Sequence, residues 1–173
     1  MNELVVNNLI ISEEDIYETS MSLLRGKIFH ATPIESFNKI IKDGCICGNK
    51  DGKLGCHWSE NSFGRNRGYV CLFDFVNKTD KTIENCLESF SFLSPRVFGE
   101  HIGFFVFPLN LSKNLLFSDD ARLENISGEK YMPDVECWYP SNLSLDYCLE
   151  AFTVKIHPLH PPDPYVKALC EAQ

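Results

Sequence analysis

The stretch from Lys27 to Gly44 limits the possible folds most strongly, because it combines a short strand, a polar corner and an amphipathic helix. Its apolar residues recur at helical spacing, so one face of the helix is expected to meet a core; they are Ile34, Phe37, Ile40 and Ile41. Thr32 is expected to cap the helix, Pro33 to take its first position and Gly44 to end it. His30 then stands where the strand meets the helix.

The remaining pattern places helices early in the chain and strands late. Strands are expected at 69–76, 101–108, 135–140 and 151–156, and short helices at 12–26 and 82–90. No internal repeat or change of composition divides the 173 residues. This order favours a single α+β domain, with an N-terminal arm or strand and helix (1–26), a core (27–156) and a proline-rich tail (157–173).

Charge and hydropathy exclude some classes of partner. The formal net charge of −8 disfavours broad binding to phosphate backbones. No apolar run approaches the roughly twenty residues of a membrane span. Residues 1–15 are acidic and lack the pattern of a signal peptide, so we expect a cytoplasmic protein that does not bind a membrane.

The eight cysteines are expected to be reduced. Four lie in apolar segments and are expected to pack as small hydrophobic residues: Cys71, Cys86, Cys137 and Cys148. Cys45, Cys47, Cys56 and His57 are residue types that bind zinc, but their spacing lacks the paired knuckles of a zinc finger. We therefore expect no metal.

Two long polar segments are candidate functional loops. Residues 44–68 show little periodicity and contain Trp58, Ser59, Arg65 and Arg67, and residues 118–133 form a second polar segment. Unstructured loops of such length are uncommon and are usually functional.

The order of a strand ending in His30-Ala31-Thr32, a helix, a loop, apolar strands and a late strand that carries Glu136 resembles the ADP-ribosyltransferase superfamily over residues 27–156. The resemblance implies a split, mostly antiparallel pair of sheets, with the helix of residues 33–43 against one face. It also implies that His30 holds the nicotinamide ribose of NAD, that Tyr69 or a serine such as Ser59 lines the nicotinamide pocket, and that Glu136 stabilises the developing cation.

The chemistry of NAD cleavage gives these residue types a physical role. Breaking the nicotinamide–ribose bond creates an oxocarbenium-like state, which a carboxylate stabilises in the transition state. Aromatic rings stack on nicotinamide, with Tyr69, Tyr131 and Trp58 as candidates, and arginine suits pyrophosphate. The expected catalytic residues are Glu136, His30 and Tyr69. The expected NAD-binding residues are His30, Ala31, Thr32, Ser59, Arg65, Arg67 and Tyr69.

Three alternatives remain open at the level of sequence. Glu150 also begins a strand and is the rival acid. The same fold can serve as a non-catalytic module that binds a protein, for which the Trp138-Tyr139-Pro140 corner is suited. A thiol enzyme would use Cys56 or Cys71 with a distant histidine. The acceptor of ADP-ribose is not defined, although the acidic charge favours a protein or small molecule over nucleic acid.

Overall fold

The computed structural model describes residues 4–52, 54, 61–90, 101–119 and 128–157. Within this part of the chain, the protein is one α+β domain, as the sequence predicts. The strands are β1 (Val6–Ser12), β2 (Ile28–Pro33), β3 (Cys45–Ile46), β4 (Val70–Asp74), β5 (His101–Phe107), β6 (Glu136–Tyr139), β7 (Leu143–Ser144) and β8 (Glu150–His157). The α-helices are α1 (Ile16–Leu24), α2 (Ile34–Asp43), α3 (Phe63–Arg67) and α4 (Asp80–Phe90), and the 3-10 helices are η1 (Glu13–Asp15), η2 (Leu109–Asn114) and η3 (Leu145–Tyr147).

Six strands form the main sheet in the order β1-β8-β5-β2-β4-β6, and β3 pairs with β7 in a small second sheet. β1 runs parallel to β8, whereas the other pairings between the strands named above are antiparallel. The predicted mostly antiparallel pair of sheets is therefore confirmed. The three apolar segments expected as central strands are β4, β5 and β8.

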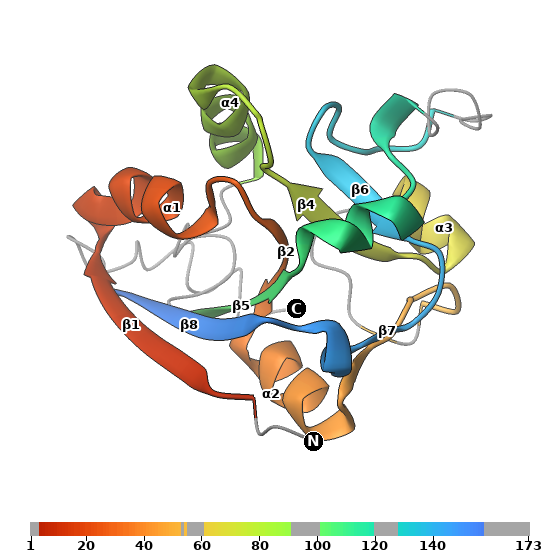
Figure 1. Ribbon diagram of the computed structural model, residues 1–173, viewed down its shortest axis with the longest axis horizontal. Helices are drawn as coiled ribbons and strands as arrows, with labels where there is room; N and C mark the ends of the chain where they lie inside the picture. Colours follow the sequence, from red (N-terminus) through yellow and green to blue (C-terminus); the bar gives the residue numbers. More distant parts are fainter. Residues whose placement is uncertain (1–3, 53, 55–60, 91–100, 120–127, 158–173) are drawn as a thin grey trace, which may run out of the picture.

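Helices cover both faces of the main sheet (Figure 1). On one face, Leu24 of α1 and Ile83 and Cys86 of α4 pack with Phe29 and Phe104 of the sheet; we call this cluster the α4-side core. On the other face, Phe37 of α2 packs with Phe105, Ile28, Leu72 and Leu143; we call this the α2-side core. Burial of these aromatic and aliphatic side chains is the main driving force for folding. None of the described helices has the length and apolar character of a membrane-spanning segment.

The start of α2 differs from the sequence prediction. Thr32 and Pro33 are the last residues of β2 and pair with Gly103 and Ile102 of β5, so the helix begins at Ile34. The cap position is Pro33, without a side-chain capping bond. The expected Thr32 cap was wrong, because hydrogen bonding to β5 continues the strand through both residues. Gly44 ends the helix in the left-handed conformation, as predicted.

Candidate active site

The main sheet opens between β2 and β4. Ile28 and Phe29 pair with Asp74 and Phe73, whereas His30–Pro33 pair only with β5 among the described strands. The two strands therefore separate beyond Phe29. Because they are antiparallel, the opening lies between the end of β2, before α2, and the start of β4, after α3.

His30 stands in this opening. Its Nδ1 atom lies 2.8 Å from the carbonyl oxygen of Cys71 on β4. If the ladder continued from the Phe29–Phe73 pair, that oxygen would accept a hydrogen bond from the amide of Ala31. The imidazole therefore takes the place of a main-chain bond, and the N–H and C=O groups of Ala31 are directed towards the opening.

The hydrogen bond fixes which ring position of His30 carries a proton. A carbonyl oxygen only accepts, so Nδ1 carries the proton and donates it to Cys71. Burial lowers the pKa of His30, while the bond to Cys71 acts in the opposite direction. A neutral imidazole with the proton on Nδ1 presents Nε2 as an acceptor. Such an acceptor is suited to a hydroxyl group.

Glu136, the first residue of β6, is buried with 6% of its surface exposed. Its Oε2 accepts from the amide of Met132 at 2.7 Å. Its Oε1 accepts from Nε1 of Trp138 at 3.0 Å and from the thiol of Cys71 at 3.3 Å. Burial raises the pKa of Glu136, and these three hydrogen bonds oppose that shift.

Cys71 connects the two residues that the sequence places in the site. Its carbonyl contacts His30 and its thiol contacts Glu136, since β4 lies between β2 and β6. Because side chains alternate between the two faces of a sheet, those of His30 and Glu136 lie on opposite faces. His30 follows Phe29 of the α4-side core, whereas Glu136 precedes Cys137 of the α2-side core. His30 and Glu136 therefore both contact Cys71, from opposite faces of the sheet, and make no direct hydrogen bond or ion pair with each other.

A thiolate is disfavoured at this position. Burial raises the pKa of Cys71 well above its usual value, and the neighbouring Glu136 carboxylate adds to the shift. Burial likewise raises the pKa of Cys86 to about 12. Since thiolate is the nucleophilic form, the geometry does not support a thiol mechanism that uses Cys71. Cys56, the other candidate, lies outside the described residues.

An aromatic cluster lies next to Glu136. Phe63 of α3 and Trp138 are buried with ring centroids 4.5 Å apart. Tyr69 and Tyr131 pack around them, with centroids 6.5 Å and 6.2 Å from that of Phe63. Tyr69 directly precedes β4 and is half-buried, at the start of the opening. Trp58 and Ser59, also expected here, lie outside the described residues.

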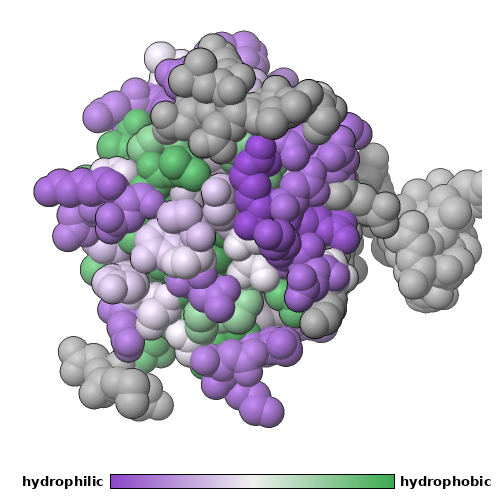
Figure 2. Space-filling view, turned by 90° about the vertical axis from the view of Figure 1, so that its right-hand side faces the viewer, coloured by the Kyte–Doolittle hydropathy of each residue, from purple (hydrophilic) through white to green (hydrophobic). Residues whose placement is uncertain are grey.

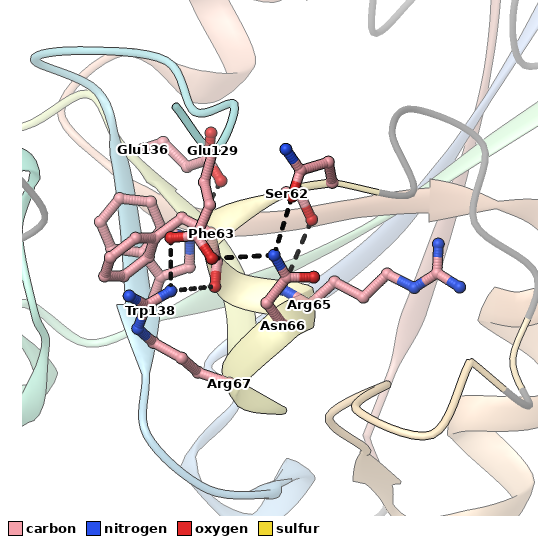
Figure 3. Close-up of polar contacts among 9 residues, drawn as sticks. Ser62, Phe63, Arg65, Asn66, Arg67, Glu129, Glu136 and Trp138 are labelled. Atoms are coloured by element: carbon pink, nitrogen blue, oxygen red, sulfur yellow. Dashed lines mark hydrogen bonds and ion pairs between the residues drawn. The ribbon is translucent and has the colours of Figure 1, made fainter. Parts of the chain in front are cut away.

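Helix α3 is tied to the segment just before β6 by Glu129 (Figure 3). Oε1 of Glu129 accepts from Asn66 at 2.8 Å, and Oε2 accepts from Nη1 of Arg67 at 2.7 Å. The Arg67 guanidinium also lies 3.8 Å from the centre of the Phe63 ring. Burial acts against the shift, but the bonds from Asn66 and Arg67 lower the pKa of Glu129. We call these residues, together with Lys130, the α3 clamp; Lys130 exchanges main-chain bonds with Asn61 and Phe63.

The two arginines of α3 differ in their surroundings. They leave the helix in opposite directions, Arg67 towards Trp138 and Arg65 away from the clamp (Figure 3). The Arg67 guanidinium is held by Glu129 and by the carbonyl of Phe63. In contrast, Nη1 of Arg65 is buried and has no hydrogen-bond partner among the residues that the structure describes.

The other expected site residues lie in several parts of the fold. Ala31 is half-buried and Thr32 is 7% exposed, both beside the opening on β2. Glu150, the rival acid, lies at the start of β8 and pairs with Lys27 at 2.8 Å, away from β4 and β6. Cys45 and Cys47 are free thiols near the surface, while His57 lies outside the described residues.

Several residues of this site have no clear sequence signal. Cys71, Met132 and Glu129 matter through hydrogen bonds between segments that lie far apart in the chain. Trp138 was detectable, because it stands two residues after Glu136 in a strand and therefore shares its face.

No protein-family model, curated protein or solved structure matches the chain. Similarity therefore assigns the chain to no family.

Proposed function

We propose that the protein is an NAD-dependent mono-ADP-ribosyltransferase, which transfers ADP-ribose to a protein acceptor and releases nicotinamide. The observation that supports this best is the opening of the sheet at His30 and Ala31. It presents a neutral acceptor, Nε2 of His30, beside the N–H and C=O groups of Ala31.

This set of groups is complementary to the nicotinamide nucleoside. A nicotinamide carboxamide has a donor and an acceptor that match the main-chain groups of Ala31. A ribose hydroxyl next to it donates to Nε2 of His30. The half-buried ring of Tyr69, at the start of β4, supplies an aromatic face for the nicotinamide ring.

Glu136 supplies the negative charge. The bond between ribose C1′ and the nicotinamide nitrogen breaks, its electron pair leaves with nicotinamide, and positive charge develops on the ribose. A carboxylate near the ribose stabilises that charge. The acceptor then forms a bond to C1′ and loses a proton.

The net charge of −8 favours a protein acceptor over nucleic acid. The surface visible from the side of α3 is mostly hydrophilic with separate hydrophobic areas (Figure 2). This pattern disfavours a broad apolar docking face there.

The test measures NAD binding by calorimetry and nicotinamide release, with labelled ADP-ribose incorporation into proteins of a cell extract. Wild-type protein should bind NAD and release nicotinamide. His30→Ala should weaken NAD binding and abolish release. Absence of NAD binding at millimolar concentration would reject the proposal.

The second candidate is a non-catalytic module that binds a protein partner. One observation favours it: the carboxylate of Glu136 is already satisfied by Met132, Trp138 and Cys71 and can be purely structural. In that case Glu136→Gln would change stability, and the wild-type protein would neither bind nor cleave NAD.

A further inference from the structure

β1 forms one edge of the main sheet, and its outer side pairs with no other strand in the part of the chain that the structure describes. On its inner side, β8 pairs with it over seven successive residues, from Val6 with Ala151 to Ser12 with His157. The strand runs along the outline of the molecule in Figure 1. Because the main-chain N–H and C=O groups of a strand alternate between its two sides, the outward groups of β1 can pair with a further strand.

Nothing in the sequence of β1 protects this edge. Natural edge strands usually carry a charge, a proline or a bulge that prevents pairing with another chain. Residues 4–12 contain no charged residue and no proline, although 23% of the chain is charged. The unbroken register with β8 excludes a bulge. Val5 and Ile10 are 72% and 68% exposed, so apolar side chains accompany the outward main-chain groups. These features are typical of a strand that pairs with another chain.

The opposite edge of the sheet is closed by the chain itself. Leu116, which follows η2, exchanges two main-chain hydrogen bonds with Trp138 of β6, each of 2.9 Å. Within the described residues, the main sheet therefore offers one open edge along a whole strand. A molecule that pairs with its own copy through a single edge forms a closed dimer, whereas two open edges would allow a filament.

The pattern of β1 is suited to a second copy of the same strand. Two antiparallel copies can be related by a twofold axis at Asn8, and residues opposite one another then point to the same face of the joined sheet. The opposed pairs are Val6 with Ile10, Val5 with Ile11, Asn7 with Leu9 and Asn8 with Asn8. Val6 packs against the α2-side core, so alternation places Ile10 on that face as well. The exposed Ile10 thus meets an apolar side chain in each copy.

The charge of the chain also favours this contact between copies. Two molecules of net charge −8 repel one another, and the repulsion is weakest where neither surface carries a charge. β1 meets this condition over its whole length. The surface that two copies can share at the lowest electrostatic cost is therefore also the one with free strand-pairing groups.

We infer that β1 is a dimer interface, at which two copies of the chain pair antiparallel about Asn8 and join their main sheets into one. The inference does not depend on the proposed function. In the strand order, β2 is three positions away from β1, so the opening between β2 and β4 stays outside the interface. The dimer therefore leaves the candidate active site of each copy accessible.

Sedimentation velocity over a range of protein concentrations tests the dimer. Ile10→Lys places a charge on the open edge, and Leu109→Lys makes the same kind of change at a 56% exposed residue of η2. Wild type and Leu109→Lys should form the same dimer. Ile10→Lys should weaken it about a hundredfold or more, because the symmetry introduces the charge twice. Far-UV circular dichroism checks that both variants are folded.

Three outcomes would overturn the inference. The first is a wild-type protein that remains monomeric up to about 0.5 mM, including one whose β1 instead binds an extended peptide of another protein. The second is a dimer that Ile10→Lys and Leu109→Lys weaken equally or not at all. The third is growth beyond a dimer with concentration. Added salt gives a further check, because screening of the net charge should tighten a dimer that has no ion pair at its interface.

The register is tested by disulfide cross-linking. In the proposed pairing, Asn8 lies opposite its own copy at a Cα separation of about 5 Å, whereas the two copies of Asn7 lie on a diagonal at about 7–8 Å. Asn8→Cys should therefore cross-link under mild oxidation and Asn7→Cys should not. Peptide mapping by mass spectrometry identifies the disulfide between the two introduced thiols. Cross-linking of Asn7→Cys in place of Asn8→Cys would overturn the proposed pairing.

Discussion

Nδ1 of His30 donates to the carbonyl oxygen of Cys71 at 2.8 Å, in the place where a continuous ladder would put the amide of Ala31. This contact has two consequences. It keeps β2 and β4 apart beyond Phe29, and it selects the imidazole tautomer that has an acceptor at Nε2. A single side chain therefore takes the place of a ladder bond and presents an acceptor at Nε2.

The first prediction concerns acid stability. Because burial lowers the pKa of His30 in the folded protein, its contribution to stability is present above the unfolded pKa of about 6.5 and is lost as the pH falls through the folded pKa. His30→Gln keeps a neutral donor to Cys71 but does not titrate. The stability of wild type relative to His30→Gln should fall below about pH 6.5, by at most about 1.4 kcal/mol per pH unit. Urea unfolding of both proteins from pH 8 to pH 5 measures this difference in stability.

A direct readout of the same group is the NMR titration of His30. Its resonances should show a proton on Nδ1 and a pKa below the usual histidine range. A pKa at or above that range would contradict burial as the feature that keeps the ring neutral.

The sequence was sufficient for the parts of the fold that have strong periodicity. The spacing of Ile34, Phe37 and Ile40 predicted α2, and the apolar runs predicted β4, β5 and β8. Local propensity did not decide the boundary at Thr32 and Pro33, because their pairing with β5 is a tertiary contact.

The site was predictable only in part. His30 stood out by its predicted place at a strand end, although β2 in fact continues to Pro33. Glu136 stood out by its place at the start of a late strand. Helix α3 was missed, because the five residues from Phe63 to Arg67 show no periodicity and are held by the α3 clamp from residues about sixty positions later. The contrast between Arg65 and Arg67 likewise depends on partners distant in sequence.

The second prediction tests the α3 clamp. Glu129→Gln should reduce stability by about 1–3 kcal/mol, because its bonds to Arg67 and Asn66 lose their charge. Hydrogen exchange should show faster exchange within α3. Since the pKa of Glu129 is lowered in the folded protein, the clamp stabilises the fold above the unfolded pKa of about 4.3. This stabilisation is lost as the pH falls through the folded pKa. Glu84→Gln, on exposed α4 surface, is the control and should change stability by less than about 0.5 kcal/mol.

The third prediction concerns the packing of α2. A Cβ at Gly103 would overlap the ring of Phe37, which stacks on Phe105 with centroids 4.5 Å apart. Gly103→Ala should therefore cost about 1–3 kcal/mol by overpacking. Phe37→Leu in the same protein makes room for the methyl group, so the double variant should lose less stability than the sum of the single variants. Additive losses in urea unfolding would show that the methyl group does not meet Phe37.

The fourth prediction separates structure from catalysis at Glu136. In Glu136→Gln, the side-chain oxygen can still accept from Trp138 and Cys71, but its amide nitrogen then faces the amide of Met132. Two donors meet there, so the variant should lose about 1–3 kcal/mol of stability. If the charge acts in the transition state, nicotinamide release should also collapse at a temperature where the variant is folded, with NAD affinity little changed.

Glu150→Gln is the matched control for Glu136→Gln. It removes the partner of Lys27 in a partly exposed ion pair and should cost about 1 kcal/mol or less, with nicotinamide release retained. The two substitutions make the same chemical change at the start of two strands, β6 and β8. Full activity of folded Glu136→Gln would remove Glu136 from the mechanism, and loss of activity in Glu150→Gln alone would transfer the role of the acid to Glu150.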